Sequence, residues 1–301
     1  MAAIRVRDLV KDYGDVRAVD GVSFEVADGE VYALLGHNGA GKSTTVEILE
    51  GHRKRTSGSV EVLGDDPGSA GRGFRDRIGI VLQRSGLEDE LKVREAVEIY
   101  GACYRQARPA ADVIELVDLT AQADRRIGAL SGGQRRRLDL ALGIVGQPSL
   151  LFLDEPTTGF DPAARRNAWA LVRQLCTSGA TVLLTTHYLE EAEHLADRVG
   201  VLHDGRLVAE GTPAELVGGG GTKVGFVLPA AVGRDDLAGI VPLDAALVGD
   251  RIEFTTTTPT AAVHALTGWA LDRELELVGL TVERPSLEDV FLALATDTVA
   301  S

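Results

Sequence analysis

The chain has few cysteines and fewer basic than acidic residues, and each shortage excludes a class of protein. Its 301 residues include two cysteines, Cys103 and Cys176, and no C-x-x-C spacing. At most one disulfide is possible and a zinc ribbon is excluded, so two free thiols in a reducing compartment are expected. The 31 basic residues face 45 acidic ones, which leaves a net charge of −14. This balance argues against a nucleic-acid or anionic-membrane partner, because both are bound through clustered lysine and arginine.

Long apolar runs are also lacking. The N-terminal segment MAAIRVRDLVKDYGD contains none, so no signal peptide is expected. The longest stretch without a charged residue, 254–271, contains four consecutive threonines, a proline and a histidine, which makes it unsuitable as a membrane span. With 45% hydrophobic residues, the chain has material for a sizeable core, and its length suits about two domains. We therefore expect a protein that does not insert into a membrane.

Short apolar runs that end in polar residues predict buried strands in the first two thirds of the chain. These runs span 31–36, 78–83, 149–155 and 181–187. Helical patterns follow three of them, near 42–51, 162–175 and 188–196. Strands that alternate with helices predict a parallel sheet whose ligands bind at the carboxyl ends of the strands. The polar residues that close these runs are therefore candidates for one shared site.

The remaining segments predict a helical insertion and a second domain. Residues 84–146 read mostly as helix and are expected to form a helical subdomain between two core strands. A run of four glycines indicates a linker at 218–222, so the first domain is expected to span 1–217. Beyond it, 223–301 predicts a small α+β domain. Its last helix would begin at a capping box formed by Ser286 and Asp289.

One motif carries specific chemistry. The segment GHNGAGKS fits the pattern G-x-x-x-x-G-K-[ST] between a predicted strand and a predicted helix. In this pattern backbone N–H groups cradle phosphate oxygens, Lys42 neutralises the β- and γ-phosphates, and the Ser43 hydroxyl binds Mg²⁺. A glycine-rich turn that only caps a helix is the alternative. The expected nucleotide-binding residues are Gly36, His37, Asn38, Gly39, Ala40, Gly41, Lys42, Ser43 and Thr44.

Two carboxylates close the run LLFLDE. Asp154 at the strand end would hold Mg²⁺, and Glu155 would polarise an attacking water. Many strands end in acidic residues, so this pair gains its meaning from LSGGQ, about 20 residues upstream. Read alone, LSGGQ predicts only a helix N-cap at Ser131.

Together, GHNGAGKS, LSGGQ and LLFLDEPTTGFDP occur in the order found in the ATP-binding cassette (ABC) ATPase family, which residues 3–217 resemble. The resemblance implies an α/β fold of the P-loop NTPase ABC cassette type, with a mixed sheet core and a helical subdomain. It also implies ATP and Mg²⁺ as ligands. In that family the LSGGQ segment contacts ATP bound to a second subunit. Here those residues are Ser131, Gly132, Gly133 and Gln134.

The same resemblance assigns roles to four further residues. Tyr13 matches the aromatic residue that stacks on adenine, unless it is an ordinary surface tyrosine. Gln83 matches the glutamine that touches Mg²⁺ and the lytic water and responds to the membrane partner. Asp161 matches the loop that crosses the dimer interface, and His187 the histidine that contacts the γ-phosphate. The implied catalytic set is Glu155, His187, Gln83 and Lys42, and the implied metal ligands are Ser43, Gln83 and Asp154.

The resemblance further implies a head-to-tail dimer of cassettes that encloses two ATP molecules. Two departures from the family pattern leave every catalytic type in place. His37 stands where proline is common, and Phe160 stands where leucine is common. We therefore expect a competent ATPase.

The tail indicates which kind of ABC protein this is. The segment RPSLEDVFLAL, at 284–294, resembles the ending of ATPase subunits of daunorubicin/doxorubicin-resistance type exporters. That resemblance implies a peripheral subunit on the cytoplasmic face of the cell membrane, which drives efflux of a drug or antibiotic through separately encoded permease subunits. Residues 84–110 would contact the permease. A soluble ABC ATPase that does mechanical work on nucleic acid, ribosomes or a cluster-assembly partner is the alternative, and a small-molecule phosphotransferase is a weaker one because it leaves LSGGQ unexplained.

Overall fold

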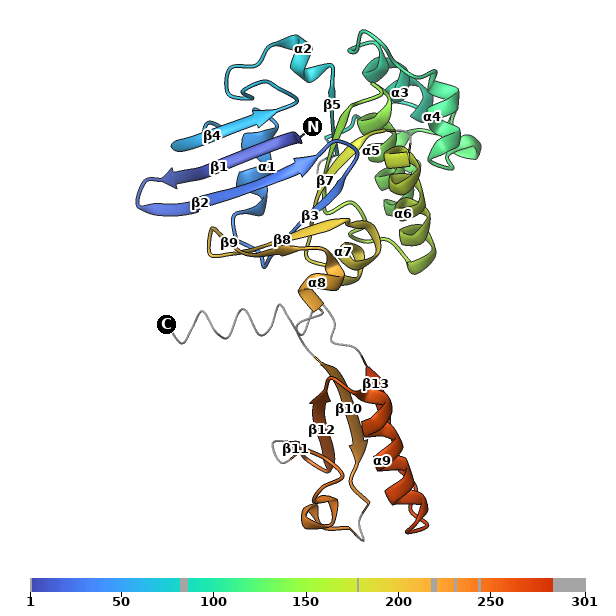
Figure 1. Cartoon of the computed structure of the whole chain (residues 1–301). Coiled ribbons are helices and arrows are strands. Elements are labelled where there is room, and N and C mark those ends of the chain that lie inside the picture. The colour runs from blue at the N-terminus through green and yellow to red at the C-terminus, as the bar shows by residue number, and fades with distance from the viewer. Residues whose placement is uncertain are drawn as a thin grey trace. The chain divides into compact units, whose positions relative to one another are not determined.

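The protein is described by a computed structural model, which covers residues 2–81, 86–177, 179–217, 221–229, 232–242 and 245–283. The chain divides into two compact units, Met1–Pro213 and Ala214–Ser301 (Figure 1). The division falls inside the short helix α8 (Pro213–Val217), after its first residue. The boundary expected from the glycine run lies at the end of this helix, after residue 217. Gln83, residues 218–220 and the tail at 284–294 lie outside the described residues.

A six-stranded sheet forms the centre of the first unit. Its strand order is β5-β6-β7-β3-β8-β9, and all neighbours are parallel except β8 and β9. The four predicted apolar runs become β5, β6, β7 and β3, which lie next to one another and are buried at nearly every position. The strands are β3 (Val31–Leu35), β5 (Ile78–Val81), β6 (Leu150–Asp154), β7 (Thr181–Thr186), β8 (Arg198–His203) and β9 (Arg206–Gly211).

A second, antiparallel sheet consists of β1 (Ala2–Tyr13), β2 (Val16–Ala27) and β4 (Ser57–Val62), in the order β2-β1-β4. Buried and exposed residues alternate from Val22 to Ala27 in β2 and from Val60 to Val62 in β4, as expected when one face packs on a core and the other meets solvent. The helix α1 (Lys42–Leu49) joins the same hydrophobic core as both sheets. This core fixes the position of the α1 N-terminus beside the end of β3.

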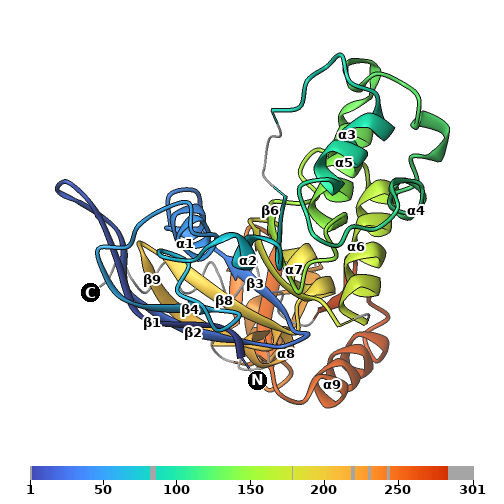
Figure 2. The ribbon, with the colours of Figure 1, turned by 90° about the horizontal axis from the view of Figure 1, so that it is seen from above.

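The remaining helices of the first unit lie mostly on one side. Between β5 and β6 the described residues include three α-helices and two 3₁₀ turns. Figure 2 shows this segment on the side of the unit remote from β1, β2 and β4. The helices are α2 (Arg72–Arg75), α3 (Val93–Gly101), α4 (Ala110–Leu116), α5 (Gly132–Ile144), α6 (Pro162–Thr177) and α7 (Leu189–Leu195), with 3₁₀ turns at Thr120–Gln122 and Ile127–Ala129.

The second unit is a small α+β structure with its own core. Its antiparallel sheet has the order β11-β12-β10-β13, and α9 (Pro259–Leu271) packs on it through Leu266 and Trp269. The strands are β10 (Thr222–Val227), β11 (Ala246–Val248), β12 (Arg251–Thr256) and β13 (Thr281–Glu283), and a 3₁₀ turn spans Arg234–Leu237. Among the described residues of the chain, no helix has the length and apolar character needed to cross a bilayer.

Candidate functional site

The loop between β3 and α1 requires glycine at several positions. Gly39 and Gly41 have φ values of 89° and 99°, in the region where a side chain is strained. A Cβ added to Gly41 would lie 2.5 Å from the carbonyl oxygen of Ala18, and one added to Gly36 would lie 2.5 Å from that of Leu202. The glycine pattern read from the sequence is therefore a steric requirement of this loop.

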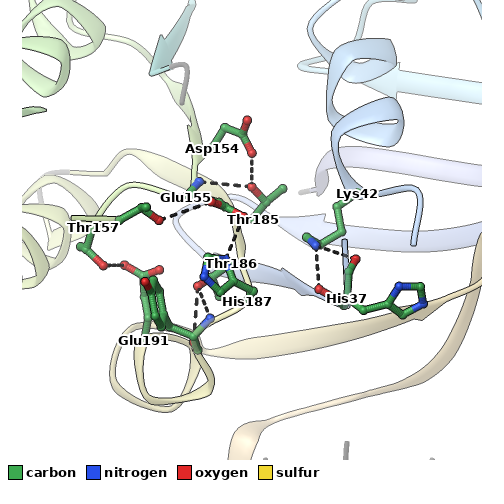
Figure 3. A network of polar contacts seen from close by, with 12 residues as sticks. His37, Lys42, Asp154, Glu155, Thr157, Thr185, Thr186, His187 and Glu191 are labelled. Atoms are coloured by element: carbon green, nitrogen blue, oxygen red, sulfur yellow. Dashed lines mark hydrogen bonds and ion pairs between the residues drawn. The ribbon is translucent and has the colours of Figure 1, made fainter. Parts of the chain in front are cut away.

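Lys42, the first residue of α1, is buried under the loop (Figure 3). Its Nζ donates hydrogen bonds to the carbonyl oxygens of Gly36, at 2.6 Å, and His37, at 3.0 Å. Burial lowers the pKa of Lys42, and the nearby carboxylates of Glu155 and Asp154 partly offset this effect. The ammonium group thus lies among oxygen acceptors and within the field of two carboxylates.

A cavity of about 320 Å³ opens over this loop. The loop and the start of α1 line one part of it, and the two carboxylates at the end of β6 line another. The cavity therefore brings the expected phosphate-binding segment and the expected carboxylates together. The described lining residues are Ala18, Asn38, Gly39, Gly41, Lys42, Ser43, Thr44, Asp154 and Glu155.

The end of β6 is held by its neighbour β7. The Thr185 hydroxyl donates to Asp154 Oδ1 at 2.5 Å, and the backbone N–H of Glu155 donates to the carbonyl oxygen of Thr185 at 3.1 Å. Glu155 itself has a φ of 47°, which is a strained conformation for a residue of this type. The strained turn points the Glu155 side chain toward the end of β7.

His187 meets Glu155 there. Its Nδ1 lies 2.8 Å from Glu155 Oε1 (Figure 3). A carboxylate only accepts hydrogen bonds, so Nδ1 carries the proton and Nε2 remains available for another partner. The Thr158 hydroxyl donates to Glu155 Oε2 at 3.3 Å. An acid and a histidine that the sequence separates by about 30 residues therefore form one hydrogen-bonded pair beside the cavity.

Arg136 is a structural residue of the site that sequence reasoning missed. It lies on α5, is buried, and donates to three consecutive carbonyl oxygens, those of Asp154 at 2.6 Å, Glu155 at 2.9 Å and Pro156 at 3.0 Å. Burial lowers its pKa, and surrounding carboxylates oppose that shift. It is the middle one of three consecutive arginines, and the helical period of α5 is the one signal that could have singled it out.

A second buried group supports the segment after β6. Glu191 on α7 accepts hydrogen bonds from the Thr157 hydroxyl at 2.8 Å and from Trp169 Nε1 at 3.2 Å. Burial raises the pKa of Glu191, and these hydrogen bonds work against that rise. The chain that carries Glu155 is therefore fixed from α5, α6 and α7.

The LSGGQ residues lie elsewhere in the first unit. Ser131 caps α5: its Oγ accepts from the backbone N–H of Gln134 at 3.3 Å, and Gln134 Oε1 accepts from the backbone N–H of Ser131 at 3.0 Å. The described residues that line the phosphate-loop cavity do not include this segment. Ser131 and Gly132 are exposed, while Gly133 is half-buried.

Two other expected residues lie at the surface. Tyr13 ends β1 and is 39% exposed, with Lys11 Nζ 4.8 Å and the Arg53 guanidinium 5.2 Å from its ring centre. Asp161 caps α6, since its Oδ1 accepts from the backbone N–H groups of Ala163 at 2.9 Å and Ala164 at 2.8 Å. Both positions are accessible to another molecule.

Comparison with known proteins identifies the family. The model of the ABC transporter family matches residues 19–158, and a model described as the C-terminal domain of ABC transporter domain-containing proteins matches 222–286. The chain is 40% identical to the daunorubicin resistance ATP-binding protein DrrA3 of Streptomyces coeruleorubidus, over 98% of this chain and 96% of that one. It is 39% identical to the Nod factor export ATP-binding protein I of Rhizobium sp. (strain N33), over 97% and 96% of the two chains.

Solved structures agree with this result. The ATP-binding subunit of an ABC transporter superposes with a TM-score of 0.66 at 26% identity, over 71% of this chain and 91% of that one. A dimeric post-hydrolysis ATP-binding cassette with ADP and Pi superposes with a TM-score of 0.64 at 26% identity, over 69% and 98%. The expected fold class, a P-loop NTPase cassette with a mixed sheet, is confirmed. The chain belongs to the ABC transporter family, as an ATP-binding subunit with ATPase activity.

Proposed function

We propose that this chain binds and hydrolyses ATP to drive export through separate membrane subunits. The observation that carries the proposal is the 2.8 Å contact between Glu155 and His187 beside a cavity that also contains Lys42. A carboxylate and an imidazole so placed suit general-base activation of water next to a bound phosphate.

The loop between β3 and α1 would bind the phosphates of ATP. Its backbone N–H groups and the N-terminus of α1 would receive the β- and γ-phosphates, and Lys42 would exchange its carbonyl partners for phosphate oxygens. Tyr13 would stack on the adenine ring. The two cations beside its ring, from Lys11 and Arg53, would then lie near the nucleotide, where they favour an anionic ligand.

The oxygen donors in the cavity fit Mg²⁺. Ser43 offers a hydroxyl and Asp154 a carboxylate that Thr185 already orients, and Mg²⁺ prefers such hard oxygen ligands. Gln83 would complete the set from outside the described residues. When bound, the ion neutralises charge that develops on the phosphates.

For hydrolysis, Glu155 would accept a proton from the attacking water while His187 positions the γ-phosphate through Nε2. Charge on the transferring group would be offset by Lys42, which is already buried where electrostatic interactions are strong. The backbone contacts from Arg136 would keep Glu155 in place without touching the substrate.

A dimer of cassettes would complete the site. Ser131 and Gly132 are exposed at the start of α5. Among the described residues, neither lines the cavity over the phosphate loop of the same chain. A second cassette in head-to-tail orientation would place its Ser131–Gln134 segment over the γ-phosphate, and Asp161 would lie in the interface. Both ATP molecules would then be enclosed between two chains.

The permease would dock next to α3. A cavity of about 240 Å³ lies between the end of α1, β5, α3 and α5, with Glu50, Arg75, Tyr100 and Tyr104 among its lining residues. Ile99 and Tyr100 on α3 are exposed, as expected for a contact with another protein. Both exposed residues lie within the 84–110 segment expected to contact the membrane subunits.

The proposed cargo is a drug or antibiotic, in line with the name of the daunorubicin resistance relative. The Nod factor export relative is nearly as similar, which fits a cargo chosen by the membrane subunits. The chain would act at the cytoplasmic face as a peripheral subunit, with the cassette at 1–217 and an accessory domain at 223–301.

The test is the Glu155→Gln variant in the native cells. It should bind ATP and accumulate as an ATP-bound dimer. Its hydrolysis rate should fall by about 100- to 10,000-fold, because the glutamine amide is too weak a base to accept the proton of the attacking water. Gentle solubilisation of membranes should then co-purify a polytopic membrane protein in stoichiometric amount.

The matched control is Glu190→Gln, an exposed glutamate on α7 that pairs with Arg165 at 3.2 Å. It should hydrolyse ATP at the parent rate. Unchanged hydrolysis in Glu155→Gln would remove the proposed role of Glu155. Ribosomal or nucleic-acid partners, with no membrane protein, would support the soluble ABC alternative.

A further inference from the structure

A group of possible metal ligands lies against the phosphate loop, apart from the proposed Mg²⁺ ligands. It consists of His37 in the loop and of His203 and Asp204 at the turn between β8 and β9. One ligand atom from each of the three side chains lies within 4.8 Å of the other two. His37 Nε2 is 3.5 Å from Asp204 Oδ1, and His203 Nδ1 is 3.6 Å from Asp204 Oδ2.

The hydrogen bond of His37 prepares it to bind a metal. Its Nδ1 lies 2.9 Å from the carbonyl oxygen of Asn38. A carbonyl oxygen only accepts, so Nδ1 carries the proton in the neutral ring and Nε2 presents a lone pair. Metal-binding histidines usually have this arrangement, with the second ring nitrogen donating to a carbonyl or carboxylate. The ring points away from Lys42 (Figure 3).

The other two side chains complement it. His203 Nδ1 is buried and has no hydrogen-bond partner among the described residues, although a polar atom in that position normally has one. Asp204 has a φ of 47°, and this left-handed turn carries its carboxylate to the side where both imidazoles lie. A cation between the three would satisfy His203 Nδ1 and the Asp204 charge together.

We propose that His37, His203 and Asp204 bind a divalent transition-metal ion of the Zn²⁺ class. Zn²⁺ bonds to nitrogen and oxygen ligands at about 2.0–2.2 Å, so two ligands of a tetrahedral ion lie about 3.3–3.5 Å apart. Each imidazole nitrogen lies close to this distance from a different oxygen of Asp204, 3.5 Å from Oδ1 for His37 and 3.6 Å from Oδ2 for His203, so a shared oxygen ligand requires the Asp204 side chain to turn. The side chains of His37 and Asp204 are 40% and 74% exposed, so they are free to close the remaining gap.

The donor set selects the metal. Two imidazole nitrogens and one carboxylate oxygen favour Zn²⁺ and its first-row neighbours over Mg²⁺, which prefers oxygen alone. The ion would link the phosphate loop to the β8–β9 turn across a junction that already has a backbone hydrogen bond, from Gly205 N to the carbonyl oxygen of Ala40 at 3.1 Å. A fourth position would remain for water.

The test is calorimetric titration of the full chain with Zn²⁺ in the absence of nucleotide, so that its outcome does not depend on ATP binding or hydrolysis. All proteins carry Cys103→Ser, because this exposed thiol is a competing ligand. The parent should bind one Zn²⁺ per chain, and Co²⁺ should give the visible absorption of a low-symmetry site. His203→Gln and Asp204→Asn should each weaken Zn²⁺ binding by at least about tenfold. Removal of a residue that only hydrogen-bonds to a metal ligand already causes a loss of this size.

Asp204→Asn is the decisive variant, because asparagine adopts the left-handed conformation readily and keeps the turn intact. His264→Gln, which changes an exposed histidine on α9 in the second unit, is the matched control and should bind Zn²⁺ like the parent. A parent that binds no Zn²⁺, or an Asp204→Asn variant that binds it as tightly as the parent, would overturn the proposal.

Discussion

At the scale of single residues, Arg136 stabilises the chain around Glu155, whereas the adjacent Arg135 does not contact it. Its guanidinium serves three backbone carbonyls in a buried place. Arg136→Met would leave those acceptors without their donor, which should lower the free energy of unfolding by about 2–4 kcal/mol. Urea denaturation measures this loss.

Arg135→Met is the control, since Arg135 is only half-buried and its partner, Asp89, is exposed. Surface pairs of this kind contribute about 1 kcal/mol or less. Equal losses from the two variants would contradict the structural role of Arg136.

Glu50 is a second informative residue, because it is 5% exposed at the end of α1. Burial, and then the negative charges of Asp154 and Glu47, raise the pKa of Glu50 from 4.5 to about 8. His52 Nδ1 lies 3.2 Å from its Oε2. Between these two pH values the unfolded chain has an ionised Glu50 and the folded chain a neutral one, so folding takes up a proton and stability falls as pH rises.

Glu50→Gln should remove this dependence. Below about pH 4.5 the variant and the parent should have similar stability, and toward pH 8 the variant should become the more stable by roughly 3–5 kcal/mol. Denaturation at a series of pH values, without nucleotide or Mg²⁺, measures the difference. Glu47→Gln removes one of the charges that raise the pKa of Glu50, so it should give a smaller difference of the same sign. A flat difference for Glu50→Gln would show that Glu50 is ionised in the folded chain at neutral pH.

At the scale of elements, α6 depends on Asp161 for its N-terminus. Asp161→Ala removes the cap and should lower the free energy of unfolding by about 1 kcal/mol, whereas Asp161→Asn keeps a side chain that caps equally well. Thermal denaturation of the free chain separates the two. If the carboxylate also serves the proposed interface, both variants should weaken ATP-dependent dimerisation in light scattering. Equal stability of Asp161→Ala and the parent would contradict the capping role.

The strands that the sequence predicted are those of the parallel sheet. Runs such as VYALL are apolar at every position because both faces of β3 are covered. The strands β1 and β2 were not predicted. Their pairing contains several register shifts, and Asp8 has a positive φ, so the alternation that marks a half-buried strand is interrupted.

The sequence also predicted some parts of the candidate site and missed others. The phosphate loop was readable because its glycines are steric requirements at Gly36 and Gly41. That Glu155 and His187 share a site was readable from the predicted parallel sheet, because both residues close predicted strands, whereas their roles were readable only through the family resemblance. Arg136 was missed, because the helical period of α5 was the one available signal and the burial of one arginine in a run of three depends on the tertiary packing of α5 against the chain after β6.

At the scale of the whole molecule, the two units have separate cores. The core of the second unit consists of its own residues, among them Phe226, Ile252 and Trp269. A chain that ends at residue 217 should therefore fold and bind ATP with unchanged affinity, as measured by fluorescence titration. Loss of nucleotide affinity in a truncated chain that is still folded by circular dichroism would contradict the proposed boundary.

The strained turn at Glu155 makes thermal stability and ATP hydrolysis favour different residues at this position. A glycine there would relieve about 1–2 kcal/mol of left-handed strain, since it alone occupies that conformation freely. The same change would remove the proposed proton acceptor. Laboratory evolution that selects only for thermal stability should therefore favour glycine at this position and give stable cassettes without ATPase activity. Selection for ATP turnover should instead keep the glutamate and its strained backbone.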